Sequence, residues 1–97
     1  MSSLQILIVD DDYALARALQ RGIVATAPQY EVQIENDSRK AISTALSFRP
    51  DLVLMDVIMP WKDGSTVVSE MREDPMLDKT PVIYPTSNRD KHEQETH

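Results

Sequence analysis

The most informative segment of the sequence is DLVLMDVIMP, residues 51–60, in which four apolar residues precede a carboxylate and a proline ends the run. A short apolar run with turn residues at both ends predicts a buried strand. A strand buried on both faces is typical of a parallel sheet under helices, and this one would carry Asp56 to its carboxyl end. Open α/β sheets bind ligands at that edge. From this segment alone a second role stays open, because aspartate also commonly caps a turn.

Three further segments have the patterns of strands, and amphipathic segments separate them. The strands are predicted at residues 4–9, 30–35 and 80–86, and helices are predicted to begin near Tyr13, Ser38 and Ser65. Strands that alternate with helices predict right-handed crossovers and one parallel sheet. Parallel strands end at a shared edge, so the polar residues at these ends should converge there, namely Asp10, Asp11, Asp56 and Thr86.

Such a convergence would create a site for a hard cation and a phosphoryl group. Carboxylates at close range raise one another's pKa unless a cation lies between them. Mg²⁺ is commonly held by one or two carboxylates together with water and phosphate oxygens. A carboxylate can also attack phosphorus, while a metal ion and a hydroxyl donor stabilise the charge on the transferred oxygens. The sequence therefore predicts a magnesium-dependent phosphoryl acceptor site.

Three residues near these segments have predicted structural roles. Asp12 precedes the first helix and is expected to cap it. Gly22 lies inside that helix, where glycine costs about 1 kcal/mol relative to alanine, so we expect it to pack closely against a strand. Gly64, in the loop after the central strand, is expected to adopt a positive φ.

Composition argues against several functional classes. The 97 residues suffice for one domain and contain no cysteine, which rules out disulfides and thiol chemistry and fits a reducing compartment. A net charge of −6 without a basic stripe argues against direct binding of nucleic acid. The apolar run near the start, residues 6–9, is too short for a signal peptide core or a membrane span. We therefore expect a cytoplasmic protein that binds neither nucleic acid nor membrane.

Three motifs together resemble the receiver domain of two-component response regulators. They are Ile8-Val9-Asp10-Asp11, Leu54-Met55-Asp56-Val57-Ile58-Met59-Pro60 with Asp63-Gly64, and Pro81-Val82-Ile83 before Thr86-Ser87. The resemblance implies a doubly wound, flavodoxin-like parallel sheet, and it makes Asp56 the phosphoacceptor for a histidine kinase or phosphotransfer protein. It also implies that Mg²⁺ is bound by Asp10, Asp11, Asp56 and the Ile58 carbonyl, and that the Thr86 hydroxyl contacts the phosphoryl group. Such a domain is no enzyme beyond catalysing its own phosphorylation and dephosphorylation.

The sequence departs from the family pattern after its fourth strand. The family continues with a fifth strand that ends in a lysine and with a fifth helix, whereas residues 1–97 contain neither, so we expect an incomplete domain of strand order 2-1-3-4. Lys62 and Lys91 are the two lysines that could approach the site instead. An uncovered fourth strand would be a template for self-association, so a homo-oligomer is a further expectation. The alternative function is a receiver-like interaction module that does not switch on phosphorylation.

Two rival chemistries fit less well. A haloacid-dehalogenase-like phosphatase also uses a strand-end aspartate with Mg²⁺, but it needs a second aspartate two residues later, where Ile58 stands. A flavodoxin-like flavin binder needs a phosphate loop rich in serine, threonine and glycine after the first strand. Residues 10–12 occupy that position and are all aspartate. Their negative charge would repel a phosphate.

Overall fold

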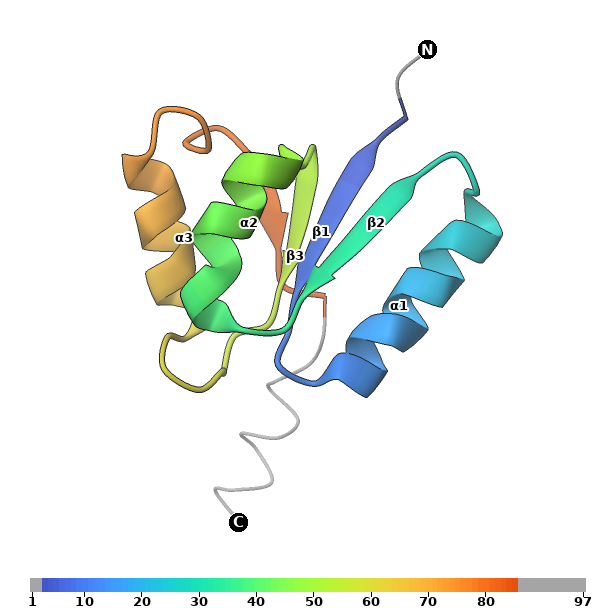
Figure 1. The fold of residues 1–97 in the computed structure, drawn as a ribbon, viewed down its shortest axis with the longest axis horizontal. Coiled ribbons are helices and arrows are strands. Elements are labelled where there is room, and N and C mark those ends of the chain that lie inside the picture. Colours follow the sequence, from blue (N-terminus) through green and yellow to red (C-terminus); the bar gives the residue numbers. More distant parts are fainter. Residues whose placement is uncertain (1–2, 86–97) are drawn as a thin grey trace.

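The chain forms an open parallel sheet with helices on both faces. A computed structural model describes residues 3–85. Along the chain the elements are β1 (Gln5–Val9), α1 (Tyr13–Thr26), β2 (Glu31–Glu35), η1 (Ser38–Lys40), α2 (Ala41–Phe48), β3 (Leu52–Met55), α3 (Gly64–Glu73) and β4 (Val82–Ile83). The strands pair in the order β2-β1-β3-β4 and every pairing is parallel, as Figure 1 shows. The predicted doubly wound sheet of order 2-1-3-4 is confirmed.

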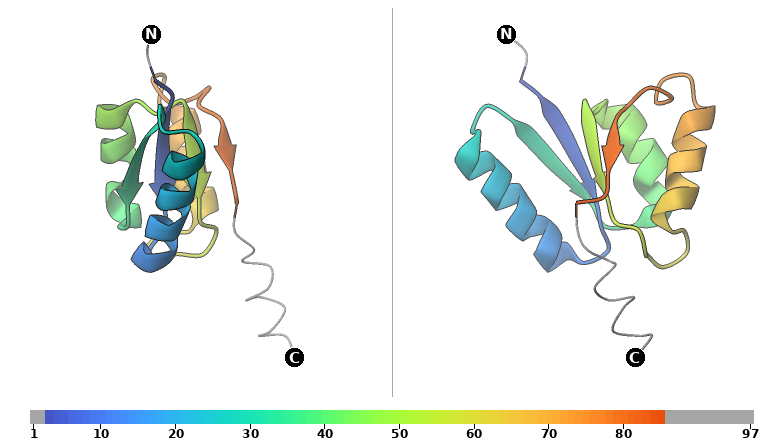
Figure 2. Two further views of the ribbon diagram at one scale, coloured as in Figure 1. Left: turned by 90° about the vertical axis from the view of Figure 1, so that its right-hand side faces the viewer. Right: turned by 180° about the vertical axis from the view of Figure 1, so that it is seen from behind.

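The two central strands supply apolar side chains to two separate core layers. Successive side chains of a strand point to opposite faces, so a strand covered on both faces is apolar throughout. Beneath α2 and α3, the buried strand residues are Leu7, Val9, Val53 and Met55. Beneath α1, they are Ile6, Ile8 and Leu54. Figure 2 shows α1 on one side of the sheet and α2 with α3 on the other.

The fourth strand is shorter than the sequence predicted. It spans only Val82–Ile83 and pairs with β3 through Val53 and Leu54. Prolines at positions 81 and 85 flank it, and a proline has no N–H to donate to the ladder, so the regular pairing stops at both. Thr86, the last residue of the predicted strand, lies outside the described residues.

Aspartate side chains cap α1 and α3 at the carboxyl edge of the sheet, whereas the N-cap residue of α2, Lys40, makes no side-chain cap. The Leu15 N–H donates to Asp12 Oδ1 at 3.1 Å, which confirms the predicted cap of α1. In the same way the Thr66 N–H donates to Asp63 Oδ1 at 2.9 Å, so α3 begins at Gly64 rather than at the predicted Ser65. None of the helices in residues 3–85 combines the length and the apolar character that crossing a membrane would require.

The predictions for the two glycines are wrong. No neighbouring atom lies within 4 Å of a Cβ placed on Gly22, so this glycine does not allow a close approach to a strand. Gly64 does not have a positive φ, and the residue of its loop that does is Trp61, with φ 69°. The physical reason for Gly64 is a close contact with the end of β3, which is described below.

Candidate functional site: a carboxylate cluster at the sheet edge

Asp10 and Asp56 lie next to each other because β1 and β3 are neighbours that end in register. Val9 pairs with Met55, and the following N–H, that of Asp56, donates to the Val9 carbonyl at 2.9 Å. Asp10 is anchored toward β2, since its N–H donates to the Glu35 carbonyl at 3.1 Å. Asp10 and Asp56 are each only 3% exposed. The strand ends thus place two buried carboxylates side by side.

Asp11 completes a cluster of three carboxylates. Asp10, Asp11 and Asp56 each offer an oxygen atom, and these atoms all lie within 4.8 Å of one another. Asp11 is exposed, so solvent and small ions reach the cluster from its side. In the part of the chain that the structure describes, this is the one group of three or more acidic, histidine or cysteine residues at metal-binding spacing. Hard carboxylate oxygens are the donors that Mg²⁺ prefers, so the residues fit this ion.

The cluster stores unfavourable electrostatic energy. Burial raises the pKa of Asp10 from its ordinary value of 3.8 to about 6. The Asp12 N–H, which donates to Asp10 Oδ1 at 2.9 Å, opposes the rise, whereas the charges of Asp56 and then Asp11 add to it. A divalent cation between the carboxylates would remove this repulsion and favour their charged forms. The electrostatics therefore agree with the donor set in favouring a cation.

The loop of residues 57–63 leaves β3 directly after Asp56 and is closed at its base. The Gly64 N–H donates to the Val57 carbonyl at 2.7 Å. A Cβ on Gly64 would overlap the Asp56 carbonyl oxygen, so only glycine allows α3 to start this close to the strand end. Met59 is buried in the core, whereas the Ile58 side chain is 50% exposed. The main chain of Ile58 therefore lies between two fixed residues, and metal binding by its carbonyl stays a prediction.

A comparison with known protein families assigns this architecture. The family model of the response regulator receiver domain matches residues 6–96. The chain belongs to the response regulator receiver domain family. This confirms the resemblance that the three motifs indicated, and with it a role in two-component signalling.

Curated relatives of this receiver domain are longer proteins. The response regulator PleD of Caulobacter vibrioides is 39% identical over 85 residues, which cover 88% of this chain and 18% of PleD. The response regulator MprA of Mycolicibacterium vanbaalenii is 36% identical over 83 residues, which cover 86% of this chain and 34% of MprA. The chain thus spans a minor part of these relatives.

Solved receiver structures share the fold. The chemotaxis protein CheY4 of Vibrio cholerae superimposes with a TM-score of 0.77 at 27% identity, over 97% of this chain and 79% of CheY4. The phosphorylated cyanobacterial phytochrome response regulator RcpA gives a TM-score of 0.76 at 27% identity, over 98% of this chain and 76% of RcpA. Both comparisons support the same parallel sheet.

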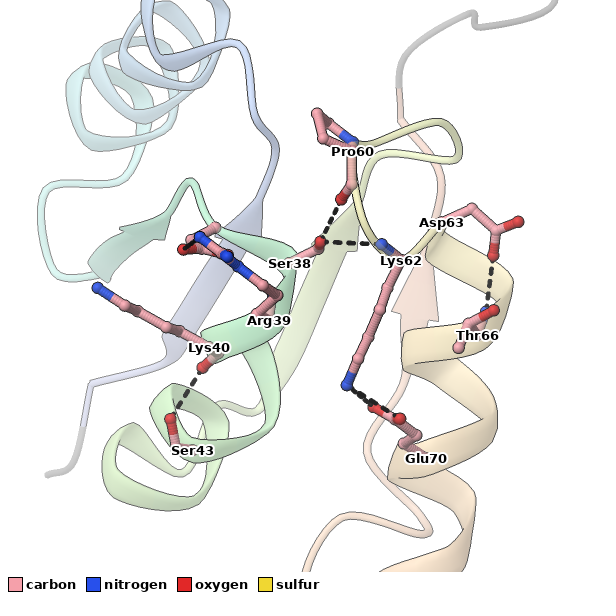
Figure 3. Close-up of polar contacts among 10 residues, drawn as sticks. Ser38, Arg39, Lys40, Ser43, Pro60, Lys62, Asp63, Thr66 and Glu70 are labelled. Carbon is pink, nitrogen blue, oxygen red and sulfur yellow. Dashed lines mark hydrogen bonds and ion pairs between the residues drawn. The ribbon is translucent and has the colours of Figure 1, made fainter.

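The receiver fold brings three of the predicted site residues together, Asp10, Asp11 and Asp56, and their roles stay predictions. Two other residues of the sequence prediction, Thr86 and Lys91, lie outside the described residues. Lys62, the second lysine considered for the site, donates to both carboxylate oxygens of Glu70 at 2.9 and 3.0 Å (Figure 3). This ion pair holds the Lys62 side chain along α3.

Ser38 belongs to the surroundings of the site, which its sequence pattern does not indicate. The pattern predicts only that a helix begins near this position. In the structure Ser38 is 2% exposed, and its hydroxyl donates to the Pro60 carbonyl at 2.6 Å, in the loop that follows Asp56. A contact between two loops has no periodic signal in the sequence. A small polar residue among turn residues was the sole cue.

Proposed function

We propose that this receiver domain accepts a phosphoryl group on Asp56 from a histidine kinase or a phosphotransfer protein, and that it signals through the conformational change that follows. The observation that carries the proposal is the cluster in which Asp10, Asp11 and Asp56 place oxygen atoms within 4.8 Å of one another. Further support comes from the similar receiver RcpA, whose solved structure is the phosphorylated protein.

Asp56 is the nucleophile in this mechanism. One carboxylate oxygen forms a bond to phosphorus while the bond from phosphorus to the donor atom breaks, and the donor leaves with that electron pair. Asp10, Asp11, Asp56 and the Ile58 carbonyl would hold Mg²⁺, which would supply positive charge to stabilise the transferred oxygens. The family resemblance gives the Thr86 hydroxyl, which lies outside the described residues, the role of donor to the same oxygens. The domain modifies its own carboxylate, so it is the acceptor of the transfer and not an enzyme that turns over a substrate.

Phosphorylation of Asp56 is tested with acetyl phosphate and Mg²⁺, followed by intact-mass spectrometry. We expect one phosphoryl adduct on the unchanged protein and none on Asp56→Asn. Asp51→Asn is the matched control, because Asp51 is an exposed carboxylate at the opposite end of the same strand and should leave the adduct unchanged. An adduct that persists on Asp56→Asn would contradict the proposal.

Mg²⁺ binding is tested separately by thermal unfolding with and without the ion. We expect Mg²⁺ to raise the melting temperature, because a ligand that binds the folded state stabilises it. The rise should disappear when Asp11→Asn and Asp56→Asn are combined. Mg²⁺ binding without any adduct would favour the alternative function, an interaction module that keeps the acids and does not switch on phosphorylation. The observation that favours this alternative is the Lys62–Glu70 ion pair, because it engages the ammonium group of a candidate lysine on α3.

Two further predictions concern the setting of the domain. We infer a cytoplasmic location, which the lack of cysteine favours. We also infer self-association along β4, where Ile83 is 50% and Tyr84 is 45% exposed. Light scattering over a wide concentration range measures the second property, and a monomer at every concentration would contradict it.

A further inference from the structure

The loop after Asp56 contains a strained turn. Trp61 has φ 69°, and the Lys62 N–H donates to the Pro60 carbonyl at 2.8 Å across it. A three-residue turn of positive φ is rare and strained, and a bulky residue with positive φ is a genuine outlier. Such strain persists only where the surrounding structure fixes the backbone. The residues that fix this turn come from a different loop.

Ser38 holds both backbone groups that define the turn. Its hydroxyl donates to the Pro60 carbonyl at 2.6 Å and accepts from the Lys62 N–H at 3.3 Å (Figure 3). Ser38 is 2% exposed, so water does not compete for these groups. Its own position is fixed by a short turn, in which the Lys40 N–H donates to the Asp37 carbonyl at 2.9 Å.

Arg39 holds the ring of the strained residue. The guanidinium carbon of Arg39 lies 3.7 Å from the centre of the Trp61 ring, a cation–π contact. Asp37 orients the guanidinium, because Arg39 Nε and Nη2 donate to the two Asp37 carboxylate oxygens at 3.1 and 3.0 Å. Trp61 is 67% exposed, so core packing does not account for the position of its ring. The contact with Arg39 does.

The turn adjoins the main chain that is proposed to bind the metal. Going back from Pro60, Met59 is buried in the core, and the Val57 carbonyl accepts from the Gly64 N–H at 2.7 Å. Ile58 lies between these two anchored residues. Only Met59 and Pro60 separate Ile58 from Trp61, so release of the turn would reach the Ile58 peptide by displacing Met59 from its place in the core.

We infer that Ser38 and Arg39 are positioning residues, which hold the strained Trp61 turn and thereby fix the Ile58 carbonyl where Mg²⁺ binds. The part of this inference that concerns Mg²⁺ rests on the proposed function, whereas the part that concerns the turn does not. In this scheme the Ser38 hydroxyl contacts the main chain of the turn, at Pro60 and Lys62. It acts through the loop.

The first test compares Ser38→Ala with Ser43→Ala. Ser43 is the matched control, because its exposed hydroxyl also donates to a carbonyl, that of Lys40 at 3.1 Å, and lies away from the turn. Trp61 is the single tryptophan of the sequence, so its fluorescence reports on the turn without any metal. We expect Ser38→Ala to change the Trp61 emission and to speed the hydrogen exchange of the Lys62 N–H. We also expect it to weaken Mg²⁺ binding about three- to tenfold, which corresponds to the free energy of one buried hydrogen bond. Ser43→Ala should leave all three properties unchanged.

The second test removes the strain of the turn in addition to the clamp, the pair of contacts that Ser38 and Arg39 make with the turn. Glycine adopts a positive φ without strain, so adding Trp61→Gly to Ser38→Ala should restore Mg²⁺ affinity to within about twofold of the unchanged protein. Arg39 is exposed, so Arg39→Gln leaves no cavity in the core. This variant therefore replaces Ser38→Ala in the test if Ser38→Ala fails to fold. Its matched control is Lys40→Gln, a neighbouring exposed cation.

The outcomes separate the two proposals. If the unchanged protein binds no Mg²⁺, the proposed function fails, while the Trp61 emission and the exchange of the Lys62 N–H still decide whether the clamp exists. If Mg²⁺ binds and Ser38→Ala leaves both metal-free signals unchanged, the clamp is wrong. If those signals change while the Mg²⁺ affinity stays the same, the link from the turn to the metal is wrong.

Discussion

Replacing Asp10 by asparagine should stabilise the metal-free protein and flatten its pH dependence. The folded-state pKa of Asp10, about 6, lies above its ordinary value of 3.8. Between these two values the folded chain keeps a proton that the unfolded chain has lost. Stability therefore falls as the pH rises through this window, and the whole penalty is present above about pH 6.

The size of this penalty follows from the pKa difference. At 1.36 kcal/mol for each pKa unit, the rise from 3.8 to about 6 corresponds to about 3 kcal/mol at most. Asp11 is exposed and admits solvent to the cluster, so screening reduces the expected penalty to about 1–2 kcal/mol. Asp10→Asn removes the charge and keeps an Oδ1 acceptor for the Asp12 N–H, which donates at 2.9 Å.

The assay is urea unfolding in the presence of a chelator, at several pH values from about 4 to about 7.5. We expect Asp10→Asn to be more stable by about 1–2 kcal/mol at pH 7, with the difference vanishing near pH 4. Hydrogen bonds from Arg39 and from the Thr66 N–H lower the pKa values of Asp37 and Asp63 respectively. The contribution of these two carboxylates to the stability of the fold is therefore lost as the pH falls. Both proteins share that slope, and the difference between them isolates Asp10.

Two further measurements decide the interpretation. Asp78→Asn is the control, an exposed carboxylate far along the chain from the cluster, and it should give a curve parallel to that of the unchanged protein. Adding Mg²⁺ should stabilise the unchanged protein, because the ion removes the same repulsion. Parallel curves for Asp10→Asn and the unchanged protein would show that burial of Asp10 does not disfavour its charge, and would refute the reasoning.

Three other substitutions test the scaffold around the site. Gly64→Ala should destabilise the fold by about 1–3 kcal/mol in urea unfolding, because its Cβ would overlap the Asp56 carbonyl oxygen, and an unchanged midpoint would contradict that contact. Asp12→Ala should cost about 1 kcal/mol and speed the hydrogen exchange of the Leu15 N–H, which it caps; unchanged exchange would show that the cap is dispensable. Arg72→Met should lower the melting temperature by removing hydrogen bonds worth about 1–3 kcal/mol in sum, and retention of the full melting temperature would mean that water replaces them. The Arg72 guanidinium donates, at 2.9–3.2 Å, to the carbonyls of Leu77, Asp78 and Thr80.

The sheet and the carboxylate cluster could be predicted because both follow from local patterns. Short apolar runs specify buried strands, and alternation with helices makes those strands parallel. Parallel strands all end at one edge, so a residue that directly follows a strand is placed by the strand itself. Asp10 and Asp56 are such residues, and they lie together at the ends of β1 and β3.

The loops could not be predicted in the same way, because their conformations depend on contacts between segments far apart in the sequence. The place of Gly64 in a turn predicts a positive φ, whereas its real constraint is the nearby Asp56 carbonyl. The positive φ belongs to Trp61, which has a low intrinsic preference for it. Ser38, 22 residues before Pro60, makes that conformation possible, and no local pattern connects the two.

Strain and charge repulsion in this domain are concentrated on one side of an otherwise consistent fold. The core layers of β1 and β3 contain only apolar side chains, and their burial stabilises the fold. At the carboxyl edge of the sheet the local arrangement instead destabilises the fold, since Asp10 is buried with a raised pKa and Trp61 is held in a strained turn only a few residues after Asp56. Departures of this kind are expected where function opposes stability. A ligand that neutralises the carboxylates acts on the same loop that Ser38 restrains, so we expect the β3–α3 loop to be the first segment to respond to phosphorylation.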